Sequence, residues 1–424
     1  MNKFTTLLIA FLFLLSSNSN SQSLSRGSLV IVGGGLEHTN KSIFNQLIGL
    51  AGGAEKASFA IIPSASGTPM QSYVYFRNIL ISYGIKPGNI YLVPVAVMDD
   101  DSTTDVNESE WKDNGNDPRL AELVRKCTAV WFSGGDQLRT VKTLVRGDGR
   151  HTPVLEAVWD VFRSGGVIGG TSAGAAIMSD VMIGGGTSLA ALSHGIIADY
   201  TGNDFPEEQG VMVTKGLGFL PYGIVDQHFN TRARIGRLAV TLMNYKKGGT
   251  LGFGVDENTA LIYNGESNRM HVAGAAGVTI LNTSDARISY VQKLPVIENI
   301  NLSYLEEGDS YDFTTGIITP ADGMESIKGK EHHSDHYSGQ EGILSPDPAA
   351  FRDLITVYLA DNKGNDTLKN ITLINPSSGF QVSLWKTPES DGFYPGKLSH
   401  GERFTVTHIR MDIVPVQVSV TPLK

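Results

Sequence analysis

Cysteine is the scarcest residue type in this 424-residue chain, which contains only Cys127. A single cysteine excludes an intramolecular disulfide and a cysteine-based zinc finger. Cys127 begins the apolar segment 127–132, whose pattern is typical of a buried strand. We therefore expect the thiol to pack in the core rather than to act in catalysis.

An apolar run long enough to span a membrane is also missing at the N-terminus. The run from Leu7 to Leu15 follows Lys3 and precedes small polar residues, whereas a bilayer span needs about 20 apolar residues. This pattern is typical of a secretory signal peptide that ends before Gln22. We expect residues 1–21 to be a signal segment and the mature chain to be secreted or periplasmic, without a membrane span.

Basic residues are too few for a general nucleic-acid-binding protein. The chain has 34 Lys and Arg against 43 Asp and Glu, which gives a net charge of −9.

The sequence motif of a dinucleotide-binding loop is incomplete as well. Gly33, Gly34 and Gly35 follow the first apolar run of the mature chain, but the third glycine of G-x-G-x-x-G is replaced by His38. We expect a tight turn between a strand and a loop there.

What is present fits a soluble globular protein with room for two domains, since 41% of the residues are apolar and 18% are charged. Between residues 28 and 273, short apolar runs alternate with helical patterns. The predicted strands are 28–32, 58–62, 89–95, 129–132, 166–168, 223–225, 251–255, 260–263 and 270–273. The predicted helices are 45–51, 71–83, 120–126, 140–145 and 154–163. This alternation predicts an α/β fold with three layers and a mostly parallel sheet.

The character of the sequence changes after residue 285. Residues 286–349 are polar and rich in glycine, which predicts a linker. Beyond residue 350, short alternating runs are separated by turn signals such as 362–365. We expect a catalytic domain over 22–285 and a small C-terminal all-β domain over 350–424. Its predicted strands are 354–359, 368–373, 381–385, 404–410 and 412–420.

The motif G-x-S-x-G occurs at residues 170–174, with Ser172 at its centre and a predicted strand before it. Glycines on either side let a strand turn sharply into a helix, so that the serine oxygen stands exposed at the helix N-terminus. The free N–H groups there, beginning with that of Ala173, can stabilise an oxyanion. The alternative is an ordinary turn with a serine that caps the helix.

His228 is the candidate base, because it follows another predicted strand and is expected at the same sheet edge as Ser172. Arg232, Arg234 and Arg237 come shortly afterwards, at the start of a predicted helix. Positive charge opposes the helix dipole at that end, so an anion or nearby carboxylates must compensate. We interpret this as a pocket that binds a carboxylate, with a solvated basic helix end as the alternative.

The base needs an orienting carboxylate, and Asp256 and Glu257 both follow the predicted strand 251–255. Adjacent side chains of a strand point in opposite directions, so only one of the two reaches His228. We favour Glu257, although the sequence leaves the choice open. The turn 133–137 offers a second oxyanion donor, the N–H of Gly135, and places Gln137 within reach of a substrate.

Four motifs together resemble the cyanophycinase branch of the S51 serine peptidases, which also contains aspartyl dipeptidase. They are Gly170–Ala175, Phe132–Gln137, Asp226–Phe229 with the three following arginines, and Gly254–Ala260. The resemblance covers roughly residues 27–285. It implies a flavodoxin-like core, a triad of Ser172, His228 and Glu257, and no metal or organic cofactor.

The resemblance also implies cleavage of cyanophycin, a poly-aspartate with arginine on each β-carboxyl, to β-Asp-Arg dipeptides. Gln137, Asp226, Gln227, Arg232, Arg234 and Arg237 match substrate-binding positions. Asp226 would then pair with a substrate guanidinium or hold the pocket arginines in place. Cyanophycinases are typically dimers, so a homodimer is expected by resemblance alone.

Two features depart from the family pattern. The segment 184–210 is enlarged and lies between nucleophile and base in the sequence, where it can cover or reshape the cleft. The C-terminal β region lies outside the family core. Alternative functions are therefore a dipeptidase for short Asp-Xaa or β-aspartyl peptides, and a catalytically silent secreted binding protein. We assign no metal to His332, His333 and His336, which lack the helical H-E-x-x-H arrangement.

Overall fold

The structure is a computed structural model that describes residues 27–198, 200, 205–245, 249–336, 342–344, 350–395 and 403–419. The predicted signal segment 1–21 lies outside the described residues. Within them, no helix has the length and apolar character that a bilayer crossing demands.

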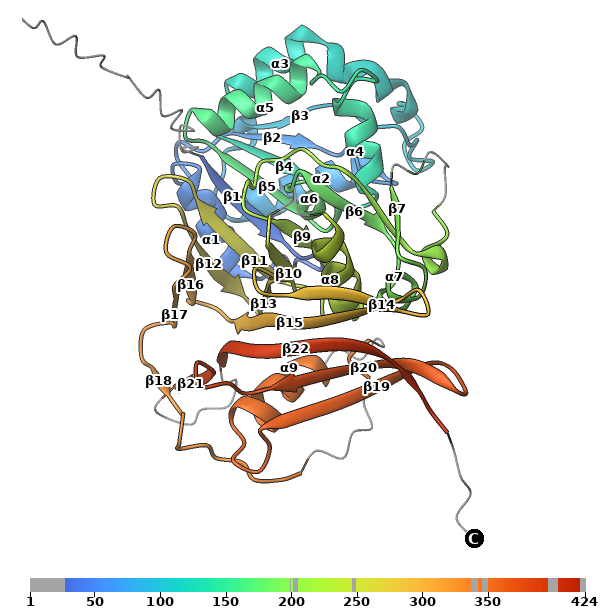
Figure 1. The fold of residues 1–424 in the computed structure, drawn as a ribbon. Coiled ribbons are helices and arrows are strands. Elements are labelled where there is room, and N and C mark those ends of the chain that lie inside the picture. Colours follow the sequence, from blue (N-terminus) through green and yellow to red (C-terminus); the bar gives the residue numbers. More distant parts are fainter. Residues whose placement is uncertain are drawn as a thin grey trace, which may run out of the picture.

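Across the described residues, the first sheet has nine strands in the order β17-β16-β12-β11-β1-β5-β4-β2-β3 (Figure 1). The strands from β1 to β3 in this order run parallel, and β11, β12, β16 and β17 add antiparallel neighbours. The parallel strands are β1 (Ser28–Val32), β2 (Phe59–Ile62), β3 (Ile90–Leu92), β4 (Ala129–Phe132) and β5 (Val167–Thr171). The antiparallel strands are β11 (Thr259–Asn264), β12 (Arg269–Gly274), β16 (Ser310–Asp312) and β17 (Ile318–Thr319). The predicted parallel core is confirmed.

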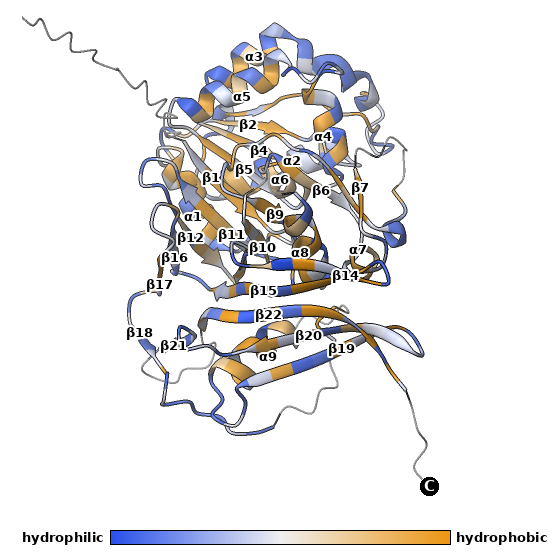
Figure 2. Ribbon diagram, in the orientation of Figure 1, coloured by the Kyte–Doolittle hydropathy of each residue, from blue (hydrophilic) through white to orange (hydrophobic). Residues whose placement is uncertain are grey.

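Helices cover both faces of this sheet, as the alternation of β1 illustrates. Leu29 and Ile31 face the core formed with α3 and α5, whereas Val30 and Val32 face the core formed with α1 and α2. The helices are α1 (Lys41–Leu50), α2 (Pro69–Ser82), α3 (Pro118–Arg125), α4 (Gln137–Leu144) and α5 (Pro153–Arg163). Figure 2 shows the apolar strands lying between helices of mixed hydropathy. Period-two burial of a central strand is what a three-layer fold requires.

A second sheet contains many of the strands that follow residue 223, and this corrects the expectation of a single sheet. Its path is β18-β21-β22-β15-β13-β10-β9, with β14, β19 and β20 attached. Its first members are β9 (Ile224–Asp226), β10 (Leu251–Val255), β13 (Val278–Asn282), β14 (Arg287–Val291) and β15 (Leu294–Leu305). A short buried run does not reveal which sheet it joins, so periodicity could not separate β9 and β10 from the first sheet.

The C-terminal region continues the second sheet instead of forming a separate unit. Its strands are β18 (Met324–Ser326), β19 (Thr367–Asn375), β20 (Ser378–Trp385), β21 (Asp391–Pro395) and β22 (Thr405–Gln417). β22 pairs with β15 and lies beside it in Figure 1. Ile300 on β15 and Met411 on β22 share one apolar core with α8 (Ile235–Asn244).

The structure therefore differs from the predicted linker 286–349, because β14 and β15 lie in that range. The region is not all-β either. The predicted strand 354–359 lies in α9 (Ala350–Ile355) and a following π-helical turn, Thr356–Ala360. The predicted strands 404–410 and 412–420 fall largely within one strand, β22.

The segment 184–210 contributes to a small third sheet, whose strand order is β6-β8-β7. The elements of this region are β6 (Val181–Gly185), α7 (Ser188–His194), β7 (Ile196–Ala198), a 3-10 turn (Glu207–Gln209) and β8 (Val211–Lys215). Of the three strands, only β7 lies entirely within the segment, whereas β6 ends inside it and β8 follows it. Residues 199 and 201–204 lie outside the described residues. Ser188 accepts hydrogen bonds from the N–H groups of Gly236 and Arg237, which ties α7 to the start of α8.

Candidate active site

Ser172 occupies a sharp turn between β5 and α6 (Ala173–Ala176). Its φ of 54° and ψ of −110° lie in a region that non-glycine residues rarely adopt. A Cβ at Gly170 would lie 2.5 Å from the carbonyl oxygen of Gly174, and a Cβ at Gly174 would lie 2.5 Å from that of Phe132. Both glycines of the motif are thus required for the turn that presents the serine.

His228 follows β9 in the second sheet and meets Ser172 across the junction of the two sheets. The Oγ atom of Ser172 lies 2.8 Å from Nε2 of His228. The backbone N–H of His228 donates to the carbonyl oxygen of Gly33 at 2.6 Å, and that of Ser172 donates to the carbonyl oxygen of Val32 at 2.9 Å. The end of β1 therefore holds both residues in place.

Glu257, and not Asp256, contacts the imidazole: its Oε1 lies 2.5 Å from Nδ1 of His228. The Asp256 carboxylate points away and accepts hydrogen bonds from the N–H of Asn230 at 3.0 Å and the hydroxyl of Tyr304 at 3.2 Å. Adjacent side chains at a strand end diverge in this way. The geometry therefore identifies Glu257 as the acid that contacts His228, a choice that the sequence left open.

The glycine run at 33–35 has a part in this site that sequence reasoning missed. A Cβ at Gly34, whose φ is +112°, would lie 2.2 Å from Cε1 of His228. A Cβ at Gly35 would lie 3.2 Å from Cβ of Glu257. Because these glycines have no side chains, the side chains of His228 and Glu257 pack directly against their backbone. The feature that could have revealed this role is the position of the glycine run directly after β1, because β1 pairs with β5, whose end leads to Ser172.

Burial favours the neutral form of the imidazole. It lowers the pKa of His228 below its ordinary value of 6.5, and the positive charges of Arg232 and Arg234 lower it further. The hydrogen bond that the imidazole donates to Glu257 acts in the opposite direction. A neutral imidazole with a free Nε2 lone pair is the form that accepts a proton from a serine hydroxyl.

Backbone N–H groups lie beside the serine oxygen. Among the described residues, the N–H groups of Ala173, Gly134 and Gly135 find no hydrogen-bond acceptor. Gly134 lines the cavity in front of Ser172, and a Cβ there would lie 3.4 Å from Cβ of Ser172. Gly135, the predicted donor, lies close to the backbone of Ala65 on the side where a Cβ would stand. The turn after β4 thus presents two glycine donors, of which Gly134 is next to the serine.

The arginines after His228 divide into two kinds. Arg237 is 1% exposed and grips Asp226 with two hydrogen bonds of 2.6 and 2.8 Å, while its Nη1 donates to Gly186. Its expected contact with substrate is replaced by a structural one, because the guanidinium is enclosed. Asp226 holds the pocket arginines in place, with Arg234 3.7 Å away.

Arg234 and Arg232 remain nearer to the site. Burial, followed by the charge of Arg237, lowers the pKa of Arg234 to about 9. Its Nη1 donates to the carbonyl oxygen of Gln227 at 2.5 Å. Arg232 is exposed. Asp226 pairs with Arg237 and Arg234, and the charge of Glu207 also acts on Arg234. Arg232 and Arg234 both place positive charge near His228.

The two predicted glutamine contacts differ. The amide of Gln137 donates to the carbonyl oxygens of Ile183 and Gly184 at 3.0 and 2.7 Å, so it anchors β6. Gln227 is 5% exposed, and its Oε1 has no hydrogen-bond partner among the described residues. A buried unpaired amide oxygen beside the base is a ready acceptor for a ligand donor.

A cavity of about 270 Å³ opens in front of Ser172 and His228. Besides these two residues, it is lined by Gly35, Leu36, Ser72, Tyr75, Phe76, Ile79, Trp131, Ser133, Gly134 and Thr171. It is large enough for a side chain and a short stretch of peptide backbone.

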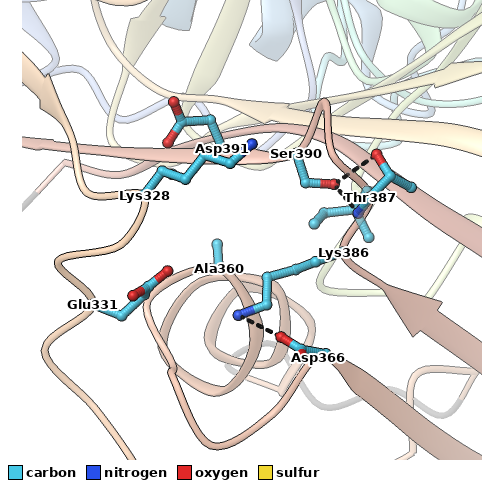
Figure 3. A pocket seen from close by; sticks show the side chains of 10 residues that line it. Lys328, Glu331, Ala360, Asp366, Lys386, Thr387, Ser390 and Asp391 are labelled. Atoms are coloured by element: carbon cyan, nitrogen blue, oxygen red, sulfur yellow. Dashed lines mark hydrogen bonds and ion pairs between the residues drawn. The ribbon is translucent and has the colours of Figure 1, made fainter.

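A second cavity, of about 210 Å³, lies in the C-terminal region (Figure 3). Its charged side chains already have partners. Lys386 pairs with Asp366 at 3.2 Å, and Asp391 accepts a hydrogen bond from Ser326. We assign no chemistry to it. Nor do the described residues contain a cluster of three His, Cys, Asp or Glu side chains that could hold a metal.

Known proteins resemble this chain over the same region. The sequence model of peptidase family S51 matches residues 29–271, more than half of the chain. Cyanophycinase of Geminocystis herdmanii is 32% identical over 298 residues, which is 68% of this chain and 95% of that protein. Cyanophycinase of Synechococcus elongatus is 29% identical over 308 residues, covering 71% and 84%. The crystal structure of a peptidase from an acI-B1 Actinobacterium has a TM-score of 0.46 at 21% identity, over 68% of this chain and 98% of its own. The chain therefore belongs to peptidase family S51 and is a serine-type peptidase.

Proposed function

We propose that Ser172, His228 and Glu257 act as a catalytic triad. The Oγ of Ser172 attacks the peptide carbonyl while its proton passes to Nε2 of His228, 2.8 Å away. Glu257 accepts a hydrogen bond from Nδ1–H of the imidazole, orients the ring and stabilises its charged form. The imidazolium then protonates the leaving amine, and water activated by the same histidine releases the acyl group.

The N–H of Ala173 and one glycine N–H of the turn 133–135 form the proposed oxyanion hole. Donors of this kind stabilise the tetrahedral intermediate, and losing one costs about 10²–10³-fold in kcat. Their lack of other acceptors among the described residues supports the assignment.

For the substrate we propose an aspartyl polymer, with cyanophycin as the first candidate. The observation that carries this is the positive charge of Arg232 and Arg234, which acts on His228, the hydrogen-bond partner of the nucleophile. A guanidinium binds a carboxylate through two parallel hydrogen bonds, which suits a chain of aspartyl groups. The relatives named cyanophycinase are consistent with this choice. We further propose export of the mature chain, directed by residues 1–21.

A second candidate is a dipeptidase for short Asp-Xaa or β-aspartyl peptides. The small cavity of about 270 Å³ at Ser172 favours it, because a cavity of that size holds few groups beyond the scissile bond. Mass spectrometry of products from cyanophycin and from dipeptides separates the two candidates. Release of β-Asp-Arg supports the polymer, and cleavage of dipeptides alone supports the second candidate.

The nucleophile is tested with Ser172→Ala. We expect this variant to lose more than about 10³-fold of kcat while it keeps the fold and binds substrate. Hydrolysis at the wild-type rate would contradict the triad.

A further inference from the structure

The buried carboxylate of Asp256 joins three segments of the chain, although the mechanism proposed above does not use it. Its Oδ1 accepts the N–H of Asn230, in the turn after β9, at 3.0 Å. Its Oδ2 accepts the N–H of Gly277, just before β13, at 3.4 Å and the hydroxyl of Tyr304 on β15 at 3.2 Å. Asp256 therefore ties the turn after β9 to both of these neighbouring strands.

Two of the joined segments carry the proposed base and its partner. Asn230 follows His228 by two residues, and Glu257 is the residue after Asp256. His228 has a φ of +45°, which non-glycine residues rarely adopt, so its backbone depends on the contacts around it. The distance between the imidazole and its carboxylate partner thus depends on how firmly Asp256 holds the turn.

The hydroxyl of Tyr304 is a lasting hydrogen-bond donor to this carboxylate. Tyr304 is fully buried. Burial, followed by the charges of Asp256 and Glu306, raises its pKa well above the ordinary value of 10, so the hydroxyl keeps its proton. A buried carboxylate is costly unless such donors replace the water that it has lost.

The C-terminal region holds the strand end from which this hydroxyl comes. Tyr304 pairs with Val406 on β22. Two residues later, Glu306 accepts hydrogen bonds from Nε of Arg352 on α9 at 2.6 Å and from the N–H of Phe404 at 2.7 Å. The contacts of α9 and β22 therefore fix the place of the hydroxyl.

We infer that Tyr304 is a positioning residue for the triad: its hydroxyl holds the Asp256 carboxylate, which fixes the turn that carries His228. The inference rests on the proposed triad and adds to it a residue beyond the family match, which ends at residue 271. It makes the C-terminal region, acting through β15, a determinant of the rate of the chemical step.

The need for the hydroxyl depends on the charge of Asp256. The ionisable groups near it come from β15, α9 and the triad: Tyr304, Glu306, Arg352, His228 and Glu257. Burial raises the pKa of Asp256 to about 7, and the charge of Glu306 acts in the same direction. Below this pH the acid is neutral and loses little without the hydroxyl, whereas above it the charged form needs each donor.

The test is Tyr304→Phe, which removes the hydroxyl and keeps the ring. Tyr263→Phe is the matched control, because Tyr263 is 1% exposed, donates to Asn268 at 3.2 Å and does not line the cavity at Ser172. We would measure kcat and KM of both variants at several pH values on either side of 7, alone and combined with Asp256→Asn. Thermal melts report whether each variant folds.

We expect Tyr304→Phe to lower kcat by about tenfold above pH 7, with little change in KM, and the loss to shrink below that pH. Tyr263→Phe should stay within about twofold of the wild type at every pH. The loss should disappear in the Asp256→Asn background, because an asparagine carries no charge and its Oδ1 can still accept the N–H of Asn230.

Three results would each overturn the positioning role while the triad stands. They are a loss that does not vary with pH, a loss equal to that of Tyr263→Phe, and a loss that persists in the Asp256→Asn background. Unfolding of Tyr304→Phe alone would make the tyrosine a structural residue and would overturn the role as well. Full activity in Ser172→Ala would instead overturn the proposed function.

Discussion

At the scale of single residues, the site separates two neighbouring acids by their environments. Glu257 contacts the imidazole of His228, whereas Asp256 is enclosed between Asn230 and Tyr304. Burial raises the pKa of Asp256 from 3.8 to about 7, and its hydrogen bonds only partly offset this. Glu257 is therefore placed to orient the imidazole, whereas Asp256 holds the end of the strand.

Glu257→Gln and Asp256→Asn form a matched pair that tests this division. We expect Glu257→Gln to lower kcat by about 10²–10⁴-fold, because the amide no longer fixes the imidazole tautomer or stabilises its charge. Asp256→Asn should keep most of the activity. Steady-state kinetics of both variants measures the two losses. A larger loss of kcat in Asp256→Asn than in Glu257→Gln would contradict this division of roles.

The same aspartate predicts a dependence of stability on pH. Its folded pKa of about 7 lies above the unfolded value of 3.8, so its contribution is fully present below pH 3.8 and is lost as the pH rises through 7. The wild-type free energy of unfolding should fall over this interval relative to that of Asp256→Asn. Denaturant unfolding at several pH values measures the difference, and parallel curves would refute it.

Burial is the main cause of the lowered pKa of His228, and Arg232 adds to it, so we expect Arg232 to affect the pH dependence of activity. Its charge lowers the imidazole pKa, so Arg232→Ala should raise that pKa and move the acid limb of the kcat profile to higher pH. Arg119→Ala is the control, because Arg119 is exposed and pairs with Asp117 on α3. A limb that stays in place or moves to lower pH would exclude this electrostatic coupling.

At the scale of elements, the loop after β1 connects the segments that carry Ser172, His228 and Glu257. Its carbonyl groups bind the N–H groups of His228 and Asn258, at 2.6 and 2.8 Å. It thereby joins the first sheet to the ends of β9 and β10 in the second. A displacement of this loop moves the imidazole relative to the serine.

Gly34→Ala tests the loop. The new methyl group would overlap the ring of His228, and we expect a loss of about 10²-fold in kcat because small displacements of a catalytic group are costly. Gly53→Ala is the control, since Gly53 also has positive φ, at +83°, but no atom lies within 4 Å of the added carbon. Both variants bear similar backbone strain. Equal activities would therefore contradict the proposal that the loss in Gly34→Ala comes from overlap with His228.

At the scale of the whole molecule, β15 and β22 make the C-terminal region part of the second sheet. Arg352 on α9 strengthens the connection through its hydrogen bond of 2.6 Å to Glu306, which follows β15. The family match ends at residue 271, before this region begins. The extension is therefore integral to the fold although it lies outside the matched family sequence.

A chain that ends at residue 349 should lose solubility and cooperative unfolding, because removing β22 exposes the edge of β15 and the apolar core beneath it. A chain that ends at Ser419 serves as the control. Thermal melts and size-exclusion chromatography measure the effect. A soluble, active chain of 349 residues would mean that the C-terminal region is an independent domain after all.

The sequence predicted much of the first sheet, because buried runs such as 28–32 and 129–132 are bounded by polar residues and turns. It predicted Ser172 through its glycines and His228 through its position after a strand. It could not predict that β9 and β10 join another sheet, since local pattern carries no information on long-range pairing. Nor could it distinguish the enclosed Arg237 from the exposed Arg232, because all three arginines follow the same strand.

The nucleophile comes from one sheet, whereas its base and the partner of that base come from the other. An incompletely folded chain therefore carries a serine without an activating imidazole. On the proposed mechanism, we expect proteolytic activity only after the two halves dock. Recovery of activity during refolding would then report the docking of the halves rather than the formation of either one.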